Sequence, residues 1–250
     1  LHRDLHDLIR VNPDHHPGRL YLSYNNTEQS WPELPRPEPP DDIPRWAFNQ
    51  VEALRLAAEP ILWWIDNRQI PNGEFGGGLS DDSDMTNIWP MPALMGIEPD
   101  KVTDSLKHEL EAIYENGMLT DGINTAQFDG LHTTEEGTNV QGTLMLLTYG
   151  DPRLVERMME SARGFERITG INDAGHRHFR SGYFGANRIA EERPWLWSMY
   201  QTFRLLHPGV ALVNFNGNPR AKKFMVEMAE GVAAHRHKDD NDRWVTPGIV

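Results

Sequence analysis

Three polar segments of the sequence hold residue types that can carry out acid–base chemistry on a bound ligand. They span residues 70–84, 117–136 and 169–193, and each leads into a stretch whose apolar residues have helical spacing. Long connecting segments that are not of low complexity are often functional. Their carboxylates, histidines and arginines are therefore the first candidates for a site.

The first segment gathers four carboxylates, Glu74, Asp81, Asp82 and Asp84, around three consecutive glycines. Crowded carboxylates repel one another, which raises the pKa of some of them and makes a general acid available near neutral pH. The alternative is structural, because an acid at this point can cap the next helix or favour its positive N-terminus. We predict Asp82 and Asp84 as catalytic residues and Glu74 as a substrate-binding residue.

The second segment supplies Asp129, His132 and Glu136. Glycosidases need two carboxyl groups across a sugar bond, about 6.5 to 9.5 Å apart for inversion or about 5 Å for retention. Glu136 and Asp84 occupy equivalent places in a repeat, so we expect both acids to face the same cavity. The alternative is that both are structural anions at helix N-termini. We predict Asp129, His132 and Glu136 as catalytic residues and Asn139 as a substrate-binding residue.

Within the third segment, residues 172–188 gather three arginines and two histidines in an otherwise acidic chain. The planar fork of arginine suits a carboxylate or a sulfate, so this segment predicts an anion site that would fit uronic-acid sugars. The alternative is that these arginines pair with acids of neighbouring segments. Aromatic side chains here, including Trp197, could stack on sugar rings. The substrate-binding residues predicted in this segment are His176, His178, Arg180, Arg188 and Trp195.

A lyase that acts on a uronate offers a second chemistry for the same segments. Such an enzyme neutralises the carboxylate, removes the C5 proton with a base and protonates the leaving oxygen, tasks that suit Asn or Arg, His and Tyr. Tyr183 and His132 are eligible for them, and Tyr183 is predicted as catalytic. Residue types alone leave hydrolysis and β-elimination both open.

Metal binding has weaker support in the sequence. His176-Arg177-His178 and His235-Arg236-His237 are both His-x-His, but neither has a third ligand at a recognisable spacing. The second motif lies in a charged tail, where a solvated helix end is the simpler interpretation. No metal site and no cofactor are predicted.

Internal repetition indicates which elements hold these segments. Residues 84–88 recur 52 positions later as residues 136–140, and residues 151–165 match residues 218–232 in register. Both members of the second pair begin with a short polar residue followed by proline, which is typical of a helix start. The pattern predicts three helix pairs, with helices near 84–96, 100–116, 136–149, 152–168, 194–207 and 219–235.

The N-terminal part reads differently. Residues 19–24 alternate like a short strand, and a proline-rich stretch follows, so we expect an extended arm over residues 1–44. A mostly buried helix, bent at Pro60, is expected from residue 45 onward. The sequence therefore predicts an all-α protein with an extended proline-rich arm (1–44) and a domain of repeated helical hairpins (45–250).

Such hairpins bury their apolar faces against one another in an open solenoid or a closed α/α toroid. The connections before the first helix of each pair are long and rich in charged and polar residues, which favours a complete or incomplete toroid. With Asn72-Gly73-Glu74-Phe75-Gly76-Gly77-Gly78-Leu79-Ser80-Asp81-Asp82-Ser83-Asp84 at one helix entrance, and aromatic and acidic residues at the others, the repeat resembles the α/α-toroid enzymes that process glycans. The resemblance covers roughly residues 45–237 and includes both glycoside hydrolases and polysaccharide lyases. It implies an oligosaccharide or polysaccharide substrate.

Composition excludes several classes. A net charge of −13 disfavours nucleic acid or an anionic membrane as a bulk partner. The absence of cysteine excludes disulfides and thiolate chemistry, and no phosphate loop, serine elbow or zinc helix motif occurs. No apolar run is long enough to span a bilayer. The chain is expected to be soluble. Its compartment is not predicted, and export with a leader removed before residue 1 is compatible with the sequence.

Together these observations predict an enzyme that hydrolyses an acidic glycan with paired carboxylates. The alternatives are a lyase that uses β-elimination and a noncatalytic helical scaffold that binds a protein or a glycan.

Overall fold

A computed structural model of the chain describes residues 2–25, 37–195 and 200–246. The chain divides into two compact units, Leu1–Val51 and Glu52–Val250. The boundary falls inside one helix, a few residues after the boundary at residue 45 that the sequence predicts. Each unit is described by itself below.

The first unit contains a pair of helices, which are α1 (His2–Val11) and α2 (His16–Asn25), and the start of α3 (Arg45–Asn67). Helix α1 packs against α2, and Leu5 and Leu22 are buried. The strand predicted over residues 19–24 is wrong, because these residues belong to α2. The extended arm is likewise wrong for residues 2–25. Six alternating residues are too short a pattern to separate a strand from a helix that buries one leucine against a neighbour.

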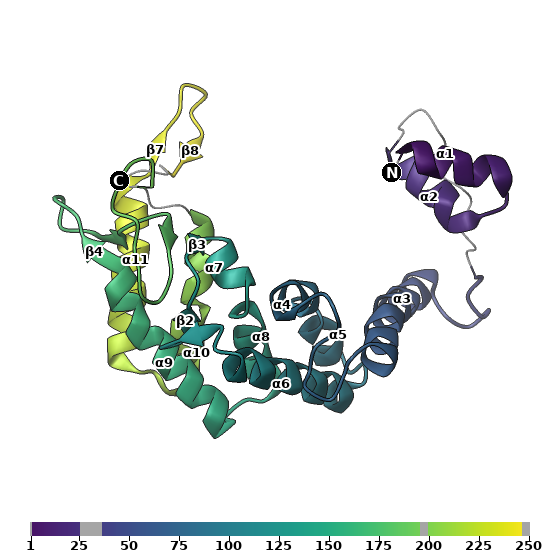
Figure 1. Ribbon diagram of the computed structural model, residues 1–250, viewed down its shortest axis with the longest axis horizontal. Coiled ribbons are helices and arrows are strands. Elements are labelled where there is room, and N and C mark those ends of the chain that lie inside the picture. Colours follow the sequence, from purple (N-terminus) through teal and green to yellow (C-terminus); the bar gives the residue numbers. More distant parts are fainter. Residues whose placement is uncertain (1, 26–36, 196–199, 247–250) are drawn as a thin grey trace. The chain divides into compact units, whose positions relative to one another are not determined.

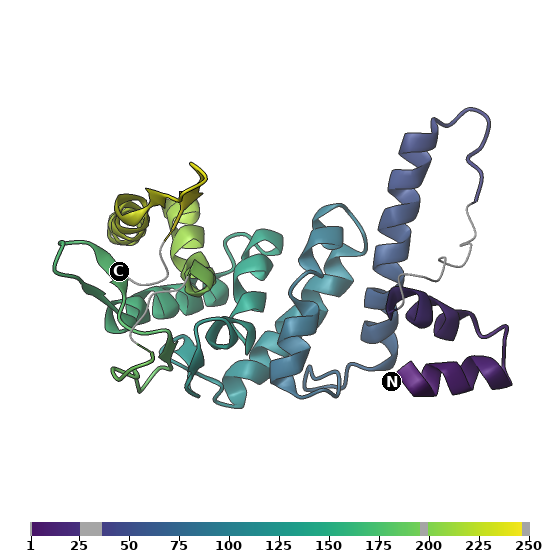
Figure 2. The same cartoon turned by 90° about the horizontal axis from the view of Figure 1, so that it is seen from above.

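The second unit is mainly helical and begins with the rest of α3. Its other helices are α4 (Leu79–Thr86), α5 (Pro90–Leu94), α6 (Pro99–Glu115), α7 (His132–Glu135), α8 (Asn139–Leu147), α9 (Pro152–Ile168), the 3-10 helix η1 (Tyr200–Leu206), α10 (His207–Asn216) and α11 (Pro219–His235). These helices follow one another in chain order through the second unit (Figure 1, Figure 2). Successive helices pack together, including α5 with α6, α8 with α9, and α10 with both α9 and α11.

Four two-stranded antiparallel ladders complete the second unit in the described residues. They are β1 (Leu119–Thr120) with β2 (Ile123–Asn124), β3 (Phe128–Asp129) with β6 (Tyr183–Phe184), β4 (Thr169–Ile171) with β5 (Arg177–Phe179), and β7 (His237–Lys238) with β8 (Trp244–Val245). The β3–β6 ladder joins two of the polar segments that the sequence singles out.

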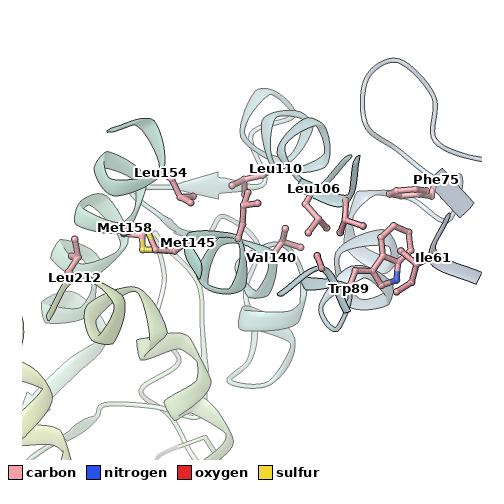
Figure 3. Close-up of a cluster of buried hydrophobic side chains, with 13 residues drawn as sticks. Ile61, Phe75, Trp89, Leu106, Leu110, Val140, Met145, Leu154, Met158 and Leu212 are labelled. Atoms are coloured by element: carbon pink, nitrogen blue, oxygen red, sulfur yellow. The ribbon is translucent and has the colours of Figure 1, made fainter. Parts of the chain in front are cut away.

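One apolar core runs through most of the helices of the second unit. It extends from Ile61 and Phe75, through Leu106 and Val140, to Leu212 on α10 (Figure 3). A second cluster gathers Phe165, Phe179, Phe184 and Met228 where α9 and α11 meet the strands. The helices are therefore held by shared burial, and the polar connections between them are free to carry function.

Two helices have the bounds that the sequence predicts, α9 over 152–168 and α11 over 219–235. The side chain of Asp151 accepts from the backbone N–H groups of Arg153 and Leu154, and Asn218 accepts from that of Ala221. These bonds satisfy N–H groups that have no partner within the helix. The predicted helix starts are confirmed.

Other helix predictions need correction. The helix expected over 84–96 is two helices, α4 and α5, with Pro90 at the first position of α5. The helix expected over 136–149 begins later, at Asn139. Of the helix expected over 194–207, residues 194 and 195 are not helical, 196–199 lie outside the described residues, and 200–206 form the 3-10 helix η1.

In the described ranges, no helix combines the length and the apolar character that crossing a membrane requires.

Candidate functional site

Helix α4 and the end of helix α7 are joined directly. Ser83 on α4 donates a hydrogen bond from its hydroxyl to the backbone carbonyl of Glu135 at the end of α7. Asp84 is the next residue of α4, and its carboxylate accepts a bond from Asn87 at 3.2 Å. Acids from the first and second polar segments therefore lie in one neighbourhood.

Burial and mutual repulsion alter the protonation of these acids. Burial raises the pKa of Glu135, and the charge of Asp84 adds to this effect more strongly than Asp129 does. Burial also raises the pKa of Glu136; His132 opposes this, while Asp81 and Asp84 reinforce it. Carboxyl groups in such a setting keep their protons to a higher pH than exposed acids do.

Asp129 and His132 form a tight pair beside these acids. The distance from His132 Nδ1 to Asp129 Oδ2 is 2.6 Å, and Asp129 Oδ1 accepts from the backbone N–H of Leu131 at 2.9 Å. Burial alone would raise the pKa of Asp129, but the bonds from His132 and Leu131 outweigh it and leave the pKa below its ordinary value. The same side-chain bond raises the pKa of His132. The pair therefore favours the protonated form of the His132 imidazole beside the Asp129 carboxylate.

The β3–β6 ladder brings the third polar segment to this pair. Asp129 lies opposite Tyr183 in the register. The ring of Trp195 stacks on Tyr183, with 4.7 Å between ring centroids and 30° between planes. Ser181 fixes this corner, because its hydroxyl donates to the carbonyl of Tyr183 at 3.1 Å. Two aromatic faces therefore stand next to the Asp129–His132 pair.

A groove of about 590 Å³ leads away from the acids between α8 and α10. Glu135 and Asn87 line it at the end where the acids lie. Its remaining walls are polar and apolar side chains, among them Asn139, Thr143, Leu146, Phe203, Arg204, His207 and Val210. The guanidinium of Arg204 lies 3.4 Å from Glu135 Oε1. The groove thus combines apolar walls with a few charged and polar groups, as ligand sites commonly do.

Asn139 is the polar group of this groove with the most unusual surroundings. Its amide nitrogen and oxygen are both buried and have no hydrogen-bond partner within the described part of the chain. A buried amide without partners costs free energy, on the order of 1 to 3 kcal/mol for each unpaired group. A bound ligand that supplied a donor and an acceptor would recover this cost.

His207 faces the same groove. Its Nδ1 donates to the carbonyl of Arg204 at 2.8 Å, whereas its Nε2 lacks a hydrogen bond of good geometry to any described residue. Burial lowers the pKa of His207, although backbone interactions with Arg204 and Thr138 oppose this. The ring is therefore neutral near pH 7. A Cβ on Gly142 would lie 1.9 Å from the ring, so only glycine at this position leaves room for it.

Several residues that the sequence predicts for the site have other partners. Asp82 is buried and accepts from the backbone N–H groups of Phe75 at 2.8 Å and Gly77 at 3.2 Å, so it holds the glycine-rich turn in place. Glu74 lies on the same turn, and its carboxylate accepts from Asn72. These contacts are structural, but they are not the helix cap given as the alternative for the first segment, because Gly78 precedes α4 and no side-chain cap bond is made there.

The arginines of the third segment also pair locally. Arg180 forms an ion pair with Glu191, and Arg177 forms one with Glu227. Arg188 is exposed, and its carbonyl accepts from the N–H of Gly185. The two ion pairs agree with the alternative given for this segment, in which its arginines pair with acids of the chain. His176 and His178 lie together in another part of the unit, and Trp197 lies outside the described residues.

Sequence reasoning missed three residues of this site, Glu135, Arg204 and His207. The repeat pointed to Glu136 because it aligns with Asp84, although its neighbour Glu135 is the acid that lines the groove. Arg204 and His207 belong to a predicted helix and carried no motif. A His-Pro pair at the start of a helix is a weak signal, since proline at the first helical positions is common.

Comparison with known proteins gave no matching family model, no matching curated protein and no matching solved structure. Function is therefore inferred from the site.

Proposed function

We propose that the protein hydrolyses a glycosidic bond of a glycan held in the groove between α8 and α10. The observation that carries this proposal is the meeting of an acid from α4, Asp84, with an acid from the end of α7, Glu135, at one end of a groove. Glu135 lines the groove, and Asn87, which also lines it, binds Asp84. Paired carboxyl groups of different protonation are what glycoside hydrolysis requires.

Glu135 is the proposed general acid. Burial and the charge of Asp84 raise the pKa of Glu135, which favours the protonated form needed to protonate a leaving oxygen. Asp84, more exposed, is the proposed base or nucleophile. His132, held by Asp129, would supply a second proton donor at the same end.

The proposed substrate is a glycan that contains uronic acids. Arg204 is a groove-lining cation whose side chain is 63% exposed, and its ion pair with Glu135 is long at 3.4 Å. A substrate carboxylate could take the place of Glu135 beside Arg204. This exchange would remove a positive charge from Glu135 and raise its pKa further at the moment when a proton is needed. The stacked rings of Tyr183 and Trp195 would offer flat faces to sugars.

Lyase chemistry is the second candidate, and one observation favours it. The β3–β6 register sets Tyr183 opposite Asp129, which binds His132. A tyrosine and a histidine in one place are suitable as acid and base for β-elimination. The proposed hydrolase and the proposed lyase would share the groove and differ in the residues that transfer protons.

We also propose that the helical hairpins are part of an α/α toroid. The packing of α8 with α9, of α10 with α9 and α11, and of α6 with α8 supports a row of neighbouring hairpins. The hydrogen bond from Ser83 on α4 to Glu135 at the end of α7 brings the first and second polar segments together, which supports a shared cavity.

The test is incubation of the full chain with uronate polysaccharides and with neutral oligosaccharides. Reducing ends without ultraviolet absorbance indicate hydrolysis, and an absorbing unsaturated product indicates a lyase. For a hydrolase, E135Q should lower kcat by roughly 100-fold to 10,000-fold, the usual contribution of a general acid. The matched control E156Q removes one exposed glutamate from α9 and should leave the rate unchanged.

Substitution of Asn139 tests substrate binding separately from the chemical step. N139A should raise KM with a smaller effect on kcat, because its amide contacts the proposed ligand and transfers no proton. Rate should fall as pH rises through the raised pKa of Glu135, since the acid form is then lost. Glycan binding without any product would make the protein a noncatalytic scaffold. If the chain showed no glycan binding and formed no product, the proposal would be refuted.

A further inference from the structure

Three histidines from distant parts of the sequence meet at one point of the second unit. His176 and His178 flank Arg177 at the start of β5, and His235 is the last residue of α11. One ring nitrogen of each lies within 4.8 Å of the others, and His176 Nδ1 is 3.0 Å from His235 Nε2. The third ligand that the His-x-His pattern lacks in the sequence is thus supplied by tertiary structure.

The backbone explains why these side chains converge. Residues two apart on a strand point to the same face, so His176 and His178 project together from the β4–β5 hairpin. Strand β5 packs against α11, and the two lie side by side at one end of the unit (Figure 1). Arg177 reinforces this contact through its ion pair with Glu227 on α11, at 2.7 Å.

Gly231 permits the close approach of α11 to the hairpin. A Cβ at this position would lie 2.7 Å from the carbonyl oxygen of Arg177 and 3.2 Å from His178 Nε2. The first distance is too short for any side chain without movement of the backbone. A helical glycine costs roughly 1 kcal/mol relative to alanine, so its presence one turn before His235 is consistent with a requirement for proximity.

His178 gives independent evidence for a ligand. Its side chain is 5% exposed, and its Nε2 is buried without a hydrogen-bond partner within the described residues. The rings of His178 and His235 have centroids 5.0 Å apart, and a ring nitrogen of His178 lies within 4.8 Å of a ring nitrogen of each of the other two histidines. A buried polar atom that lacks a partner is costly unless something binds it. The rings of His176 and His235 give it no hydrogen bond in this arrangement.

We propose that His176, His178 and His235 form a binding site for one divalent transition metal ion, of which zinc is the best fit, and that this ion fastens the β4–β5 hairpin to the end of α11. Imidazole nitrogens suit zinc, copper, nickel and iron rather than magnesium or calcium. Ligand nitrogens at about 2.0 to 2.1 Å from a tetrahedral zinc ion are separated by about 3.3 Å. Small side-chain rotations from the observed separations reach that arrangement.

Asn172 has the position of a supporting residue. Its side-chain oxygen accepts from the backbone N–H of His176 at 3.0 Å, and its side-chain nitrogen lies 3.4 Å from His235 Nε2. The first bond fixes the turn that carries His176. The second contact would give way to the metal, because His235 Nε2 has a single lone pair. Three protein ligands leave a fourth position of the zinc ion open to water or to a ligand.

The proposal is tested by calorimetric titration of zinc chloride into the full chain, purified without a histidine tag and treated with a chelator. One saturable site per chain is expected. H178A and H235A should each weaken binding by more than about 100-fold, beyond the usual cost of losing an outer-shell partner. The control H237A removes the exposed histidine two residues after His235 and should bind as the wild type does.

Two further measurements keep the test decisive if a variant folds poorly. Cobalt(II) bound to the wild-type chain should show the intense visible absorption of a four-coordinate or five-coordinate site, and zinc should displace it. Zinc at about 100 times its dissociation constant should raise Tm by about 5 to 10 °C, whereas magnesium should not. Absence of saturable zinc binding, a weak octahedral cobalt spectrum, or equal affinity in H235A and H237A would overturn the proposal.

Discussion

Replacement of Glu109 by glutamine should stabilise the protein at neutral pH. Glu109 lies on α6 with no exposed surface, and its Oε1 accepts a hydrogen bond from Thr86 at 3.0 Å. Its Oε2 is buried without a partner in the described residues. Burial, reinforced by Asp82 and only partly offset by Thr86, raises the pKa of Glu109 to about 8. Glutamine keeps the oxygen that Thr86 binds and cannot ionise.

The magnitude follows from the difference between the folded and unfolded protonation of Glu109. The pKa is about 8 in the folded chain against an ordinary value of 4.5, so between these values the folded state holds a proton that the unfolded state releases. The free energy of unfolding therefore falls by about 1.4 kcal/mol per pH unit as pH rises through this window. At pH 7, which is 2.5 units above 4.5, the loss is up to about 3 kcal/mol. E109Q should avoid it and match the wild type near pH 4.5.

Urea unfolding from pH 4.5 to pH 8.5, followed by tryptophan fluorescence, measures this effect. Trp89 is a suitable reporter because it is buried against Phe75 in the same core. The matched control E115Q removes an exposed glutamate from the end of the same helix and should leave the pH dependence unchanged. Parallel stability curves for E109Q and the wild type would mean that Glu109 is ionised in the folded chain, and the reasoning would be refuted.

Three further substitutions test the fold. D151A removes a side chain that caps α9, and should lower the free energy of unfolding by about 1 kcal/mol in urea titrations at pH 7. Because the bond from Lys107 and the helix amides lower the pKa of Asp151, the difference from the wild type should shrink as pH falls through that pKa; a constant difference would contradict this. G122A should lower Tm more strongly, since φ is +68° and a Cβ would lie 2.4 Å from the backbone nitrogen of Ser161; an unchanged Tm would show that this approach is not close. L106A should cost roughly 2 to 5 kcal/mol by leaving a cavity in the main core, and a loss below about 1 kcal/mol would indicate that the site collapses or is not packed.

Helix positions were predictable where the signal was local. Asp151-Pro152 and Asn218-Pro219 place a capping side chain and a fixed φ angle at a helix start, and the following apolar stripes continue for 17 residues in both α9 and α11. Neither feature depends on the rest of the chain. The mostly helical character of the protein followed from the same periodicity.

Predictions of helix bounds and of site residues failed where another local signal or a tertiary contact determined the structure. Pro90 divides the helix expected over 84–96, and the alternation of residues 19–24 belongs to helix α2, which buries Leu22. The choice between Glu135 and Glu136 depended on which acid turns toward the groove. A one-residue difference on a helix rotates a side chain by about 100°, which a repeat alignment cannot resolve.

The site residues of the third segment show the limit most clearly. Their charges were visible in the sequence, but the partners of Arg177 and His176 were not, because Glu227 and His235 come from α11, much later in the chain. The pairing of Arg177 with Glu227 and of His176 with His235 depends on how β5 docks on α11. Such contacts arise from packing between distant elements, for which the sequence carries no spacing rule.

The β3–β6 ladder has a consequence for the order in which the protein assembles. Phe128 pairs with Phe184, 56 positions later in the chain, and α8 and α9 lie between the two strands. Closing so long a loop costs entropy that only the docking of the intervening helices can offset. During synthesis, the Asp129–His132 pair would leave the ribosome well before Tyr183 does, and these helices would have to dock before the ladder could close.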